Sequence, residues 1–177
     1  MDRADADVDR ALDRLRGHPA PDRLFYSASA LGEFGAVWIV PAALCDRRRG
    51  DTHWHTTVRV MAAVAVESAL INLGVKSLVR RQRPIADVPR PYYVRKPLTS
   101  SFPSAHSASS FCAATLLADS DPPRAPLYYA MAAVIATSRV YVQAHRASDV
   151  LAGGALGLAW GRLVRRLVPV EPPGHEL

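Results

Sequence analysis

The stretch Ser138-Arg-Val-Tyr-Val-Gln-Ala-His-Arg-Ala-Ser-Asp149 combines an arginine, a histidine and an aspartate within a short segment. If the chain is helical from Arg146 onward, His145 and Asp149 lie one helical turn apart and share a face. A carboxylate beside an imidazole fixes the tautomer of the ring and raises its basicity, which suits a histidine that acts as a base or a nucleophile. Arg139 offers a planar set of N–H donors that fits a phosphate. By itself, the pattern is also typical of an ion pair on a protein surface.

Two earlier polar stretches carry side chains of the same kind. One is Lys76-Ser-Leu-Val-Arg-Arg-Gln-Arg83-Pro84, and the other is Pro103-Ser104-Ala105-His106. In order, the three stretches contain Lys-x6-Arg-Pro, Pro-Ser-x-His and Ser-Arg-x5-His-x3-Asp. This pattern resembles the three-part signature of the type 2 phosphatidic acid phosphatase (PAP2) family at every polar position, although Ala105 stands where the family usually has glycine. Three motifs in the same order are a specific signal, whereas one alone would be weak.

The resemblance implies a phosphatase that forms a phosphohistidine and needs no metal ion or other cofactor. His145 would attack phosphorus, Asp149 would orient its ring and stabilise its cationic form, and His106 would protonate the leaving oxygen. The phosphate would be held by four further residues, Lys76, Arg83, Ser104 and Arg139. Fixed cations would take the place of a metal, and the sequence has no carboxylate or thiolate cluster with the spacing of a metal site.

Each of these residues also has an ordinary structural interpretation. Lys76 could be a helix-end lysine that reaches the membrane surface, Arg83 could belong to an ordinary loop, and Ser104 could serve only as a helix cap. His106 could be a buried histidine with satisfied hydrogen bonds. The order and spacing of the three motifs favour the catalytic interpretation over these separate ones.

Five apolar segments are each close to the length that crosses a bilayer. They are Leu24–Cys45, Thr56–Val79, Ser104–Ala118, Pro126–Gln143 and Ser148–Val168. They predict an all-α fold, a polytopic membrane bundle of about five transmembrane helices. The run Gly153-Gly154-Ala155-Leu156-Gly157 permits close packing of the fifth helix against a neighbour. A soluble helical bundle is the competing prediction, because the segments are only moderately apolar and some members of the family are soluble acid phosphatases.

Apolar residues recur at helical spacing among aspartates and arginines near the N-terminus, so residues 1–23 predict an amphipathic, interfacial helix that lies on the membrane surface or packs on the domain. Residues 24–168 would form the phosphatase domain, and residues 169–177 a disordered tail. We expect a break at Pro19–Asp22, a polar loop at Asp46–Asp51 and a long, proline-rich loop at Arg80–Ser101. At the start of this last loop, Arg80 and Arg81 are interpreted as solvated residues or as contacts to lipid headgroups.

The composition fits one domain of 177 residues, 49% of them hydrophobic, with a formal net charge of +6. Such a charge is found in nucleic-acid-binding proteins, but here the basic residues are interspersed with apolar segments. We therefore predict a membrane bilayer and a lipid phosphate as the partners of the chain, and no nucleic acid. Cys45 and Cys112 are expected to be small buried hydrophobic residues. The sequence leaves the oligomeric state unknown.

Alternating helix directions would bring the three motifs to one face of the membrane. The arginines of two other stretches, Arg47–Arg49 and Arg162–Arg166, would lie at the opposite face. The positive-inside rule makes that opposite face cytoplasmic. We therefore expect a multi-pass protein of the cell membrane with an extracytoplasmic catalytic face.

The predicted function is removal of a terminal phosphate from a membrane lipid phosphate. Candidate substrates are phosphatidic acid, phosphatidylglycerol phosphate, a polyprenyl phosphate or diphosphate, and a polyprenyl-phosphoryl sugar phosphate. The short chain, rich in alanine and arginine, is similar to actinobacterial members of the family that act on decaprenylphosphoryl phosphoribose in cell-wall synthesis. The alternative is a non-catalytic membrane protein that binds lipid phosphates or serves as a scaffold. The set of His106, His145 and Asp149 argues against it, because binding alone requires neither an acid nor a nucleophile.

Overall fold

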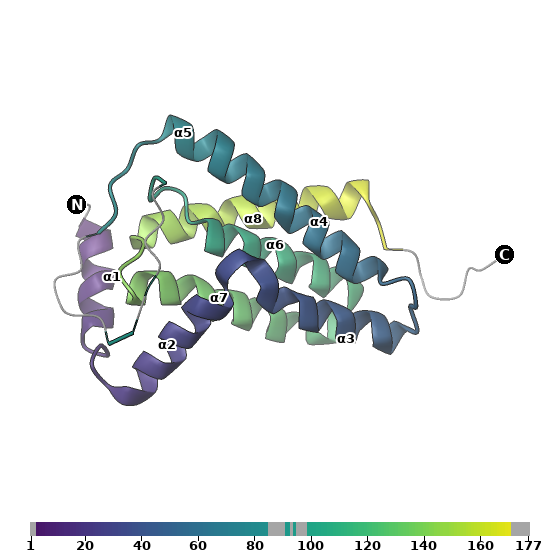
Figure 1. The fold of residues 1–177 in the computed structure, drawn as a ribbon, viewed down its shortest axis with the longest axis horizontal. Helices are drawn as coiled ribbons and strands as arrows, with labels where there is room; N and C mark the ends of the chain where they lie inside the picture. Colours follow the sequence, from purple (N-terminus) through teal and green to yellow (C-terminus); the bar gives the residue numbers. More distant parts are fainter. Residues whose placement is uncertain (1–2, 85–90, 93, 95–98, 171–177) are drawn as a thin grey trace.

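The computed structural model describes residues 3–84, 91–92, 94 and 99–170, and in this part of the chain every regular element is a helix (Figure 1). The first half contains α1 (Arg3–Asp13), α2 (Pro19–Leu31), the 3₁₀ helix η1 (Glu33–Trp38), α3 (Ile39–Arg49), α4 (His55–Ala69), the π-helix η2 (Leu70–Val75) and α5 (Lys76–Leu78). The second half contains α6 (Ala105–Ser120), the 3₁₀ helix η3 (Pro122–Arg124), α7 (Ala125–Tyr141) and α8 (Ala147–Leu167). The prediction of an all-α fold is confirmed for these residues.

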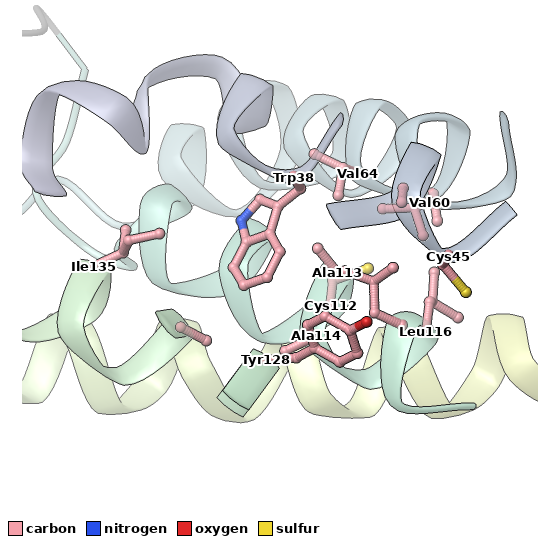
Figure 2. Close-up of a cluster of buried hydrophobic side chains, with 14 residues drawn as sticks. Trp38, Cys45, Val60, Val64, Cys112, Ala113, Ala114, Leu116, Tyr128 and Ile135 are labelled. Atoms are coloured by element: carbon pink, nitrogen blue, oxygen red, sulfur yellow. The ribbon is translucent and has the colours of Figure 1, made fainter. Parts of the chain in front are cut away.

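Helix α6 lies at the centre of the bundle, with α4, α7 and α8 packed around it (Figure 1). It is made mostly of small residues, so its neighbours can approach closely, and 11 of its 16 residues are buried. Figure 2 shows the ring of Trp38 extending from its backbone into the apolar core, which also contains Leu116 and Tyr128. Full burial of an aliphatic side chain such as that of Leu116 contributes about 1.5–3 kcal/mol. Cys45 and Cys112 are buried free thiols in this core, as expected.

Three glycines on α8 allow its backbone to touch that of α6. Gly153, Gly157 and Gly161 recur every four residues, so they lie on one face of α8. A Cβ atom on Gly153 would stand 2.3 Å from the carbonyl oxygen of Ser104, and one on Gly157 would stand 2.1 Å from that of Ala108. Real Cβ atoms do not come this close to a backbone oxygen. The close packing predicted from the glycine run is therefore confirmed, and it fixes the start of α8 against that of α6.

The substitution Gly157→Ala should destabilise the protein, because the new methyl group would collide with backbone that cannot move aside cheaply. We expect a loss of about 1–3 kcal/mol in the free energy of unfolding, measured as a lower melting temperature in detergent. The matched control is Gly74→Ala, because a Cβ on Gly74 would meet no atom within 4 Å. Equal melting temperatures for Gly157→Ala and the parent protein would show that the two backbones do not touch.

The first apolar segment, Leu24–Cys45, is not the single straight helix that we expected. Helix α2 and the helical stretch that ends with α3 are bent by 89° relative to one another. The break lies at Gly32 and Gly35, and Gly35 has a φ of +70°, a conformation that costs glycine little. A Cβ on Gly32 would stand 2.7 Å from Cγ2 of Ile135 in α7. Glycine therefore bends this segment at the place where it packs against α7.

Two other predicted breaks are wholly or partly helical. Pro19–Asp22 forms the first turn of α2, because a proline there lacks only an N–H group that would have no helical partner. The predicted loop Asp46–Asp51 is shorter than expected, because α3 continues to Arg49 and ends at Gly50 in the left-handed conformation. The buried carboxylate of Asp46 accepts hydrogen bonds from two backbone N–H groups at the start of α4, each at 2.9 Å.

The other four apolar segments are helical close to their predicted bounds. His55–Leu78 forms one continuous helix of 24 residues through α4, η2 and α5. Its length of about 36 Å is enough to cross a bilayer. Among the described helices, it is long and apolar enough to span a membrane unaided, and α2 with α3 would make a second, bent span. The count of about five crossings and the domain bounds at residues 24 and 168 stay predictions.

The helix ends that carry the three motifs lie together at one end of the bundle, which we call the motif end (Figure 1). It contains the end of α5, the start of α6 and the junction of α7 with α8, and α1 lies across it. The junction of α3 with α4 lies at the opposite end. Residues 85–90, 93 and 95–98 of the predicted loop, and residues 171–177 of the predicted tail, lie outside the described residues.

Candidate active site

His145 lies in a tight turn between α7 and α8. The carbonyl oxygen of Arg139 accepts hydrogen bonds from the N–H groups of Ala144 and His145, both at 3.0 Å, so that the chain turns back over the end of α7. Gln143 takes a left-handed conformation (φ 52°) within this reversal. The turn buries His145, whose exposed fraction is 3%. A buried histidine anchored through its backbone keeps its ring in one place, as a reacting group requires.

The two ring nitrogens of His145 face groups of opposite charge. Nδ1 lies 3.7 Å from Oδ2 of Asp149, and Nε2 lies 3.2 Å from Nη1 of Arg83. Because a guanidinium can only donate, Nε2 is the unprotonated nitrogen and Nδ1 carries the proton. Burial lowers the pKa of His145 to about 4, and the charges of Arg139 and Arg83 act in the same direction, against the raising effect of Asp149. At neutral pH the ring is therefore uncharged, with a lone pair on Nε2.

The carboxylate of Asp149 is fully buried and is held on several sides. Oδ1 accepts a hydrogen bond from Nη1 of Arg81 at 2.6 Å, and Oδ2 accepts from Oγ of Ser101 at 2.5 Å and from N of Arg146 at 2.9 Å. The bond from Arg146 belongs to the N-cap of α8, where the helix dipole favours a negative charge. Asp149 therefore keeps a fixed position opposite His145.

Lys76, Arg83 and Arg139 form a cationic cluster beside His145. Lys76 interacts electrostatically with both arginines, and both arginines interact with His145. Like charges that are held together and partly buried repel one another unless an anion joins them, so the cluster suits a phosphate. Each cation is anchored by a hydrogen bond to a nearby oxygen: Lys76 to Oδ1 of Asn72 (3.0 Å), Arg83 to the carbonyl oxygen of Ala144 (2.9 Å) and Arg139 to Oγ of Ser29.

His106 lies in the first turn of α6 and is close to the same cluster. Its ring interacts electrostatically with Arg139, His145 and Lys76. Nε2 of His106 is buried and has no hydrogen-bond partner among the described residues. Such an atom is costly to bury unless it finds a partner, and an oxygen atom of a substrate could supply one.

Ser104 is fully buried and serves as the N-cap of α6. Its Oγ accepts a hydrogen bond from N of Ser107 at 3.4 Å, and its own N–H donates to the carbonyl oxygen of Asp149 at 3.0 Å. The interpretation of Ser104 as a helix cap is confirmed, while contact between its hydroxyl and a phosphate stays a prediction. The bond to Asp149 ties the start of α6 to the start of α8, and so holds the segments of His106 and His145 together.

The model of the PAP2 superfamily matches residues 34–172 of the chain. The chain belongs to the PAP2 superfamily. The resemblance inferred from the three motifs is thereby confirmed. Helices α1 and α2 lie outside the matched residues of this PAP2 protein.

Two curated relatives are phosphatases. The decaprenylphosphoryl-5-phosphoribose phosphatase of Mycobacterium tuberculosis is 36% identical to this PAP2 protein over 141 residues, which cover 77% of this chain and 74% of the relative. The lipid A 1-phosphatase of Porphyromonas gingivalis is 36% identical over 84 residues, which cover 44% of this chain and 19% of the relative. Together with the superfamily, these relatives identify the PAP2 protein as a phosphatase.

Two solved structures share the fold. The transmembrane PAP2 type phosphatidylglycerolphosphate phosphatase of Bacillus subtilis superimposes with a TM-score of 0.68 at 23% identity, covering 93% of this chain and 84% of that one. LpxE of Aquifex aeolicus superimposes with a TM-score of 0.69 at 23% identity, covering 91% of this chain and 94% of that one. Both likenesses show that the PAP2 protein has the fold of these two proteins.

The interpretation of Arg81 as a solvated or headgroup-binding residue is wrong. Its guanidinium pairs with Asp149 at 2.6 Å and with Asp5 of α1 at 3.0 Å. Ser101, which also holds Asp149, was missed by the sequence analysis. The three motifs contain no signal for the pairing of Asp5 with Arg81, because these residues are 76 positions apart. Two arginines, Arg80 and Arg81, lie between Lys76 and Arg83, and their spacing does not indicate which of them pairs with a carboxylate.

Two hollows open near the cationic cluster of the PAP2 protein. An open cavity of about 660 Å³ is lined by polar and basic residues, namely Lys76, Ser77, Arg80, Arg81, Gln82, Arg83, Thr99 and Ser100. A groove of about 280 Å³ between α4–η2 and α8 is lined mainly by apolar residues, namely Glu67, Leu70, Ile71, Val75, Leu156, Ala159, Trp160 and Leu163. Val75 lines the groove and the next residue, Lys76, lines the cavity, so the two hollows lie beside consecutive residues of one helix.

A separate group of potential metal ligands lies at the junction of α3 with α4. Ligand atoms of Asp51, His53 and His55 lie within 4.8 Å of one another. Asp51 accepts hydrogen bonds from the backbone N–H groups of His53 and His55, at 2.9 and 3.0 Å, as an ordinary cap at the start of a helix does. This junction lies at the opposite end of the bundle from the motifs, so the group is remote from the candidate site (Figure 1).

Proposed function

We propose that this PAP2 protein removes the terminal phosphate of a membrane lipid phosphate through a covalent phosphohistidine at His145. The observation that carries the proposal is the position of the His145 ring, with Nδ1 at 3.7 Å from Asp149 and Nε2 at 3.2 Å from Arg83. A neutral imidazole oriented by a carboxylate, beside an anion site, is suited to nucleophilic attack. A binding or scaffold protein would have no use for this orientation, or for the unpaired Nε2 of His106.

In the first step, Nε2 of His145 attacks phosphorus, and the bond between phosphorus and the lipid oxygen breaks. The departing oxygen takes a proton from Nε2 of His106, which is cationic in this proposal because the bound phosphate dianion favours its charged form, so that the lipid leaves as a neutral alcohol. The phosphoryl group is then bound to Nε2 of His145 while Nδ1 keeps its proton, so the ring is cationic. Asp149 stabilises this positive charge.

In the second step, a water molecule attacks phosphorus and gives a proton to His106, which is neutral after the first step. The bond between phosphorus and Nε2 breaks, and its electron pair returns to the ring of His145. Inorganic phosphate leaves, and both histidines regain their starting protonation states. The two steps consume the lipid phosphate and water alone.

The phosphoryl oxygens would be bound by Lys76, Arg83 and Arg139. Negative charge spreads over these oxygens in the transition state, and cations that are already in place stabilise it without reorganisation. Ser104 would assist at the N-terminus of α6, where backbone N–H groups and the helix dipole favour an anion. Its Oγ accepts hydrogen bonds from N and Oγ of Ser107, and its own proton remains available for a phosphate oxygen.

The apolar groove between α4–η2 and α8 supports a lipid as the substrate. Leu70 and Leu156 line it and remain 53% and 41% exposed, as is expected of side chains that face a hydrocarbon ligand or the bilayer. Val75 lines the groove, and the next residue, Lys76, lines the polar cavity. In this proposal, a hydrocarbon chain in the groove has its phosphate at the cationic cluster.

Filling the groove should impair hydrolysis of lipids selectively. Leu156→Trp is expected to lower kcat/KM for a long-chain lipid phosphate by about tenfold, because the loss of two buried methylene contacts is enough for that change. Hydrolysis of p-nitrophenyl phosphate, which has no chain, should be unaffected. The matched control is Leu151→Trp, because Leu151 is also on α8 but is 73% exposed and does not line the groove. Equal losses on both substrates would contradict a chain-binding role.

As a finer assignment, we propose a polyprenyl-phosphoryl sugar phosphate as the substrate. A relative that matches over 77% of this chain is named for decaprenylphosphoryl-5-phosphoribose. The open cavity of about 660 Å³ has room for a sugar beside the reacting phosphate, and Arg80 adds a cation for the second phosphate of such a lipid. From the sequence, Arg80 was interpreted as a solvated residue or a headgroup contact, and the second of these is the role proposed here.

The test is phosphate release by the purified protein in detergent from a panel of lipid phosphates. The panel contains decaprenylphosphoryl phosphoribose, a polyprenyl diphosphate, phosphatidic acid and phosphatidylglycerol phosphate. We expect the highest kcat/KM for the first. A preference for phosphatidic acid would contradict the finer assignment alone, whereas no release from any lipid would contradict the phosphatase and favour a binding protein.

We also propose that the motif end faces away from the cytoplasm, because the arginines of α3 and of the end of α8 lie at the opposite end. In intact cells, a cysteine that replaces Arg80 should then react with a membrane-impermeant thiol reagent. A cysteine that replaces Arg47 should react only after the membrane is opened. Both positions are exposed, whereas the native Cys45 and Cys112 are buried. The reverse pattern of labelling would invert the orientation.

A further inference from the structure

Helix α1 lies across the motif end, although it is outside the residues that match the superfamily model, 34–172 (Figure 1). Hydrogen bonds attach the segment just after α1 to the end of α7. Nε of Arg16 donates to the carbonyl oxygen of Tyr141 at 2.9 Å, and the hydroxyl of Tyr141 donates to the carbonyl oxygen of Leu15 at 2.9 Å. The N-terminal segment is therefore hydrogen-bonded to the end of α7, directly before the turn that contains His145.

Asp5 is the buried acidic residue of α1, with an exposed fraction of 4%. Its Oδ1 accepts a hydrogen bond from N of Ser148 at 2.8 Å. Its Oδ2 accepts from Oγ of Ser148 at 2.8 Å and from Nη2 of Arg81 at 3.0 Å. A carboxylate is rarely buried to this degree unless both oxygens have partners. By contrast, Asp7 of the same helix is exposed and pairs with Arg10.

Arg81 joins Asp5 to the carboxylate beside His145. Its Nη1 donates to Oδ1 of Asp149 at 2.6 Å, while its Nη2 donates to Asp5 at 3.0 Å. One guanidinium therefore shares its single positive charge between two carboxylates, and its planar shape fixes both at once. Asp5 attracts part of the charge of Arg81 that would otherwise act on Asp149 alone. Ser148, in the first turn of α8, donates hydrogen bonds to Asp5 and directly precedes Asp149 in the chain.

We propose that Asp5 is a positioning residue of the phosphatase reaction, which acts through Arg81 on Asp149 and, through Asp149, on the basicity of His145. The proposal rests on the proposed function. With Asp5 in place, Asp149 keeps a full negative charge toward the ring. Without it, the charge of Arg81 would act on Asp149 alone, so His145 would become less basic and the cationic phosphohistidine less stable.

The groups that face His145 come from every element packed around it. They are Arg83 from the segment after α5, His106 from α6, Arg139 from α7 and Asp149 from α8. Within this set Asp149 is the anion, so a change in its effective charge acts directly on the ring. Asp5 touches none of the phosphate-binding cations in the described contacts, and its influence runs through Arg81.

The experiment compares Asp5→Asn with Asp7→Asn in the full-length protein, because both remove one negative charge from α1. We expect Asp5→Asn to lower kcat by about tenfold, the lower end of the loss that follows removal of an outer hydrogen-bond partner, with KM almost unchanged. The acid limb of the profile of kcat/KM against pH should move to lower pH. Both proteins are measured with the same substrate, so ionisation of the substrate affects the two pH profiles equally. Asp7→Asn should match the parent protein in rate and profile.

The pH profile separates positioning from mere support of the fold. If Asp5→Asn loses activity only in proportion to a loss of folded protein, with an unchanged profile, the proposal is overturned, as it is by unchanged kcat. If Asp5→Asn does not fold, Asp5→Glu keeps the charge but moves it, and it should be slower than the parent with a shifted acid limb. An Asp5→Glu protein with the parent's rate and profile would then overturn the proposal. Absence of turnover in the parent protein would instead reject the proposed function, and this inference with it.

Discussion

Replacement of His145 by alanine is expected to lower kcat by about 100- to 1,000-fold or more on every phosphate substrate, because under the proposed mechanism the variant lacks the atom that bonds to phosphorus. The protein should stay folded, since backbone hydrogen bonds to Arg139 form the turn around residue 145. Phosphate release is measured in detergent at neutral pH, with a lipid phosphate and with p-nitrophenyl phosphate. A melting curve reports the folded state.

The matched control is His53→Ala, because His53 is an exposed histidine at the opposite end of the bundle. This variant should keep the activity of the parent protein. The variant His145→Ala keeps the three cations Lys76, Arg83 and Arg139, so substrate should still bind at the cationic cluster. Near-normal hydrolysis by His145→Ala would reject the assignment of His145 as the nucleophile.

Replacement of His106 by alanine is expected to separate two kinds of substrate. If His106 protonates the departing oxygen, its loss matters most for a poor leaving group such as a lipid alcohol. A nitrophenolate departs without a proton, so p-nitrophenyl phosphate should be affected much less. We expect lipid phosphate hydrolysis to fall by about 100- to 10,000-fold, which is the usual contribution of an acid–base residue.

The measurement is the ratio of the two activities for each variant, in one detergent and at one pH. His145→Ala should lose both activities alike, since both substrates must be attacked at phosphorus. His106→Ala should change the ratio strongly in favour of p-nitrophenyl phosphate. Equal losses on both substrates would reject the role of His106 as the leaving-group acid and would favour an electrostatic role in holding the phosphate.

The parts of the site that local sequence predicts are those that depend on spacing along one helix or turn. His145 and Asp149 face one another because His145 lies in the turn just before α8, and Asp149 lies in the first turn of that helix, where its carboxylate accepts the N–H of Arg146. Ser104 caps α6 because a serine side chain can accept a hydrogen bond from an N–H three residues later. The glycine run of α8 permits contact with α6 for the same kind of local reason. Apolar length likewise predicted α4–α5, α7 and α8 within a few residues.

The parts that were missed depend on contacts between distant segments. Arg81 appeared to be a surface residue because nothing near it in the sequence indicates the two carboxylates that it joins. The bend after Leu31 depends on the packing of Gly32 against Ile135, more than 100 positions away. The helical turn at Pro19–Asp22 was a different kind of error, because proline was taken to end a helix when it begins one.

The hydrogen bonds of Asp149 have a consequence for the lifetime of the intermediate. Oδ1 accepts a hydrogen bond from Arg81. Oδ2 accepts hydrogen bonds from Ser101 and from the N–H group of Arg146, and it also faces His145. A proton could join this carboxylate only at the expense of one of these bonds, so under the proposed mechanism the proton stays on Nδ1 of the ring. The phosphoryl group is then attached to an imidazolium, which departs far more readily than a neutral imidazole would. Under this mechanism, the same bonds that hold Asp149 in place therefore make the protein release its phosphoryl group to water quickly instead of storing it.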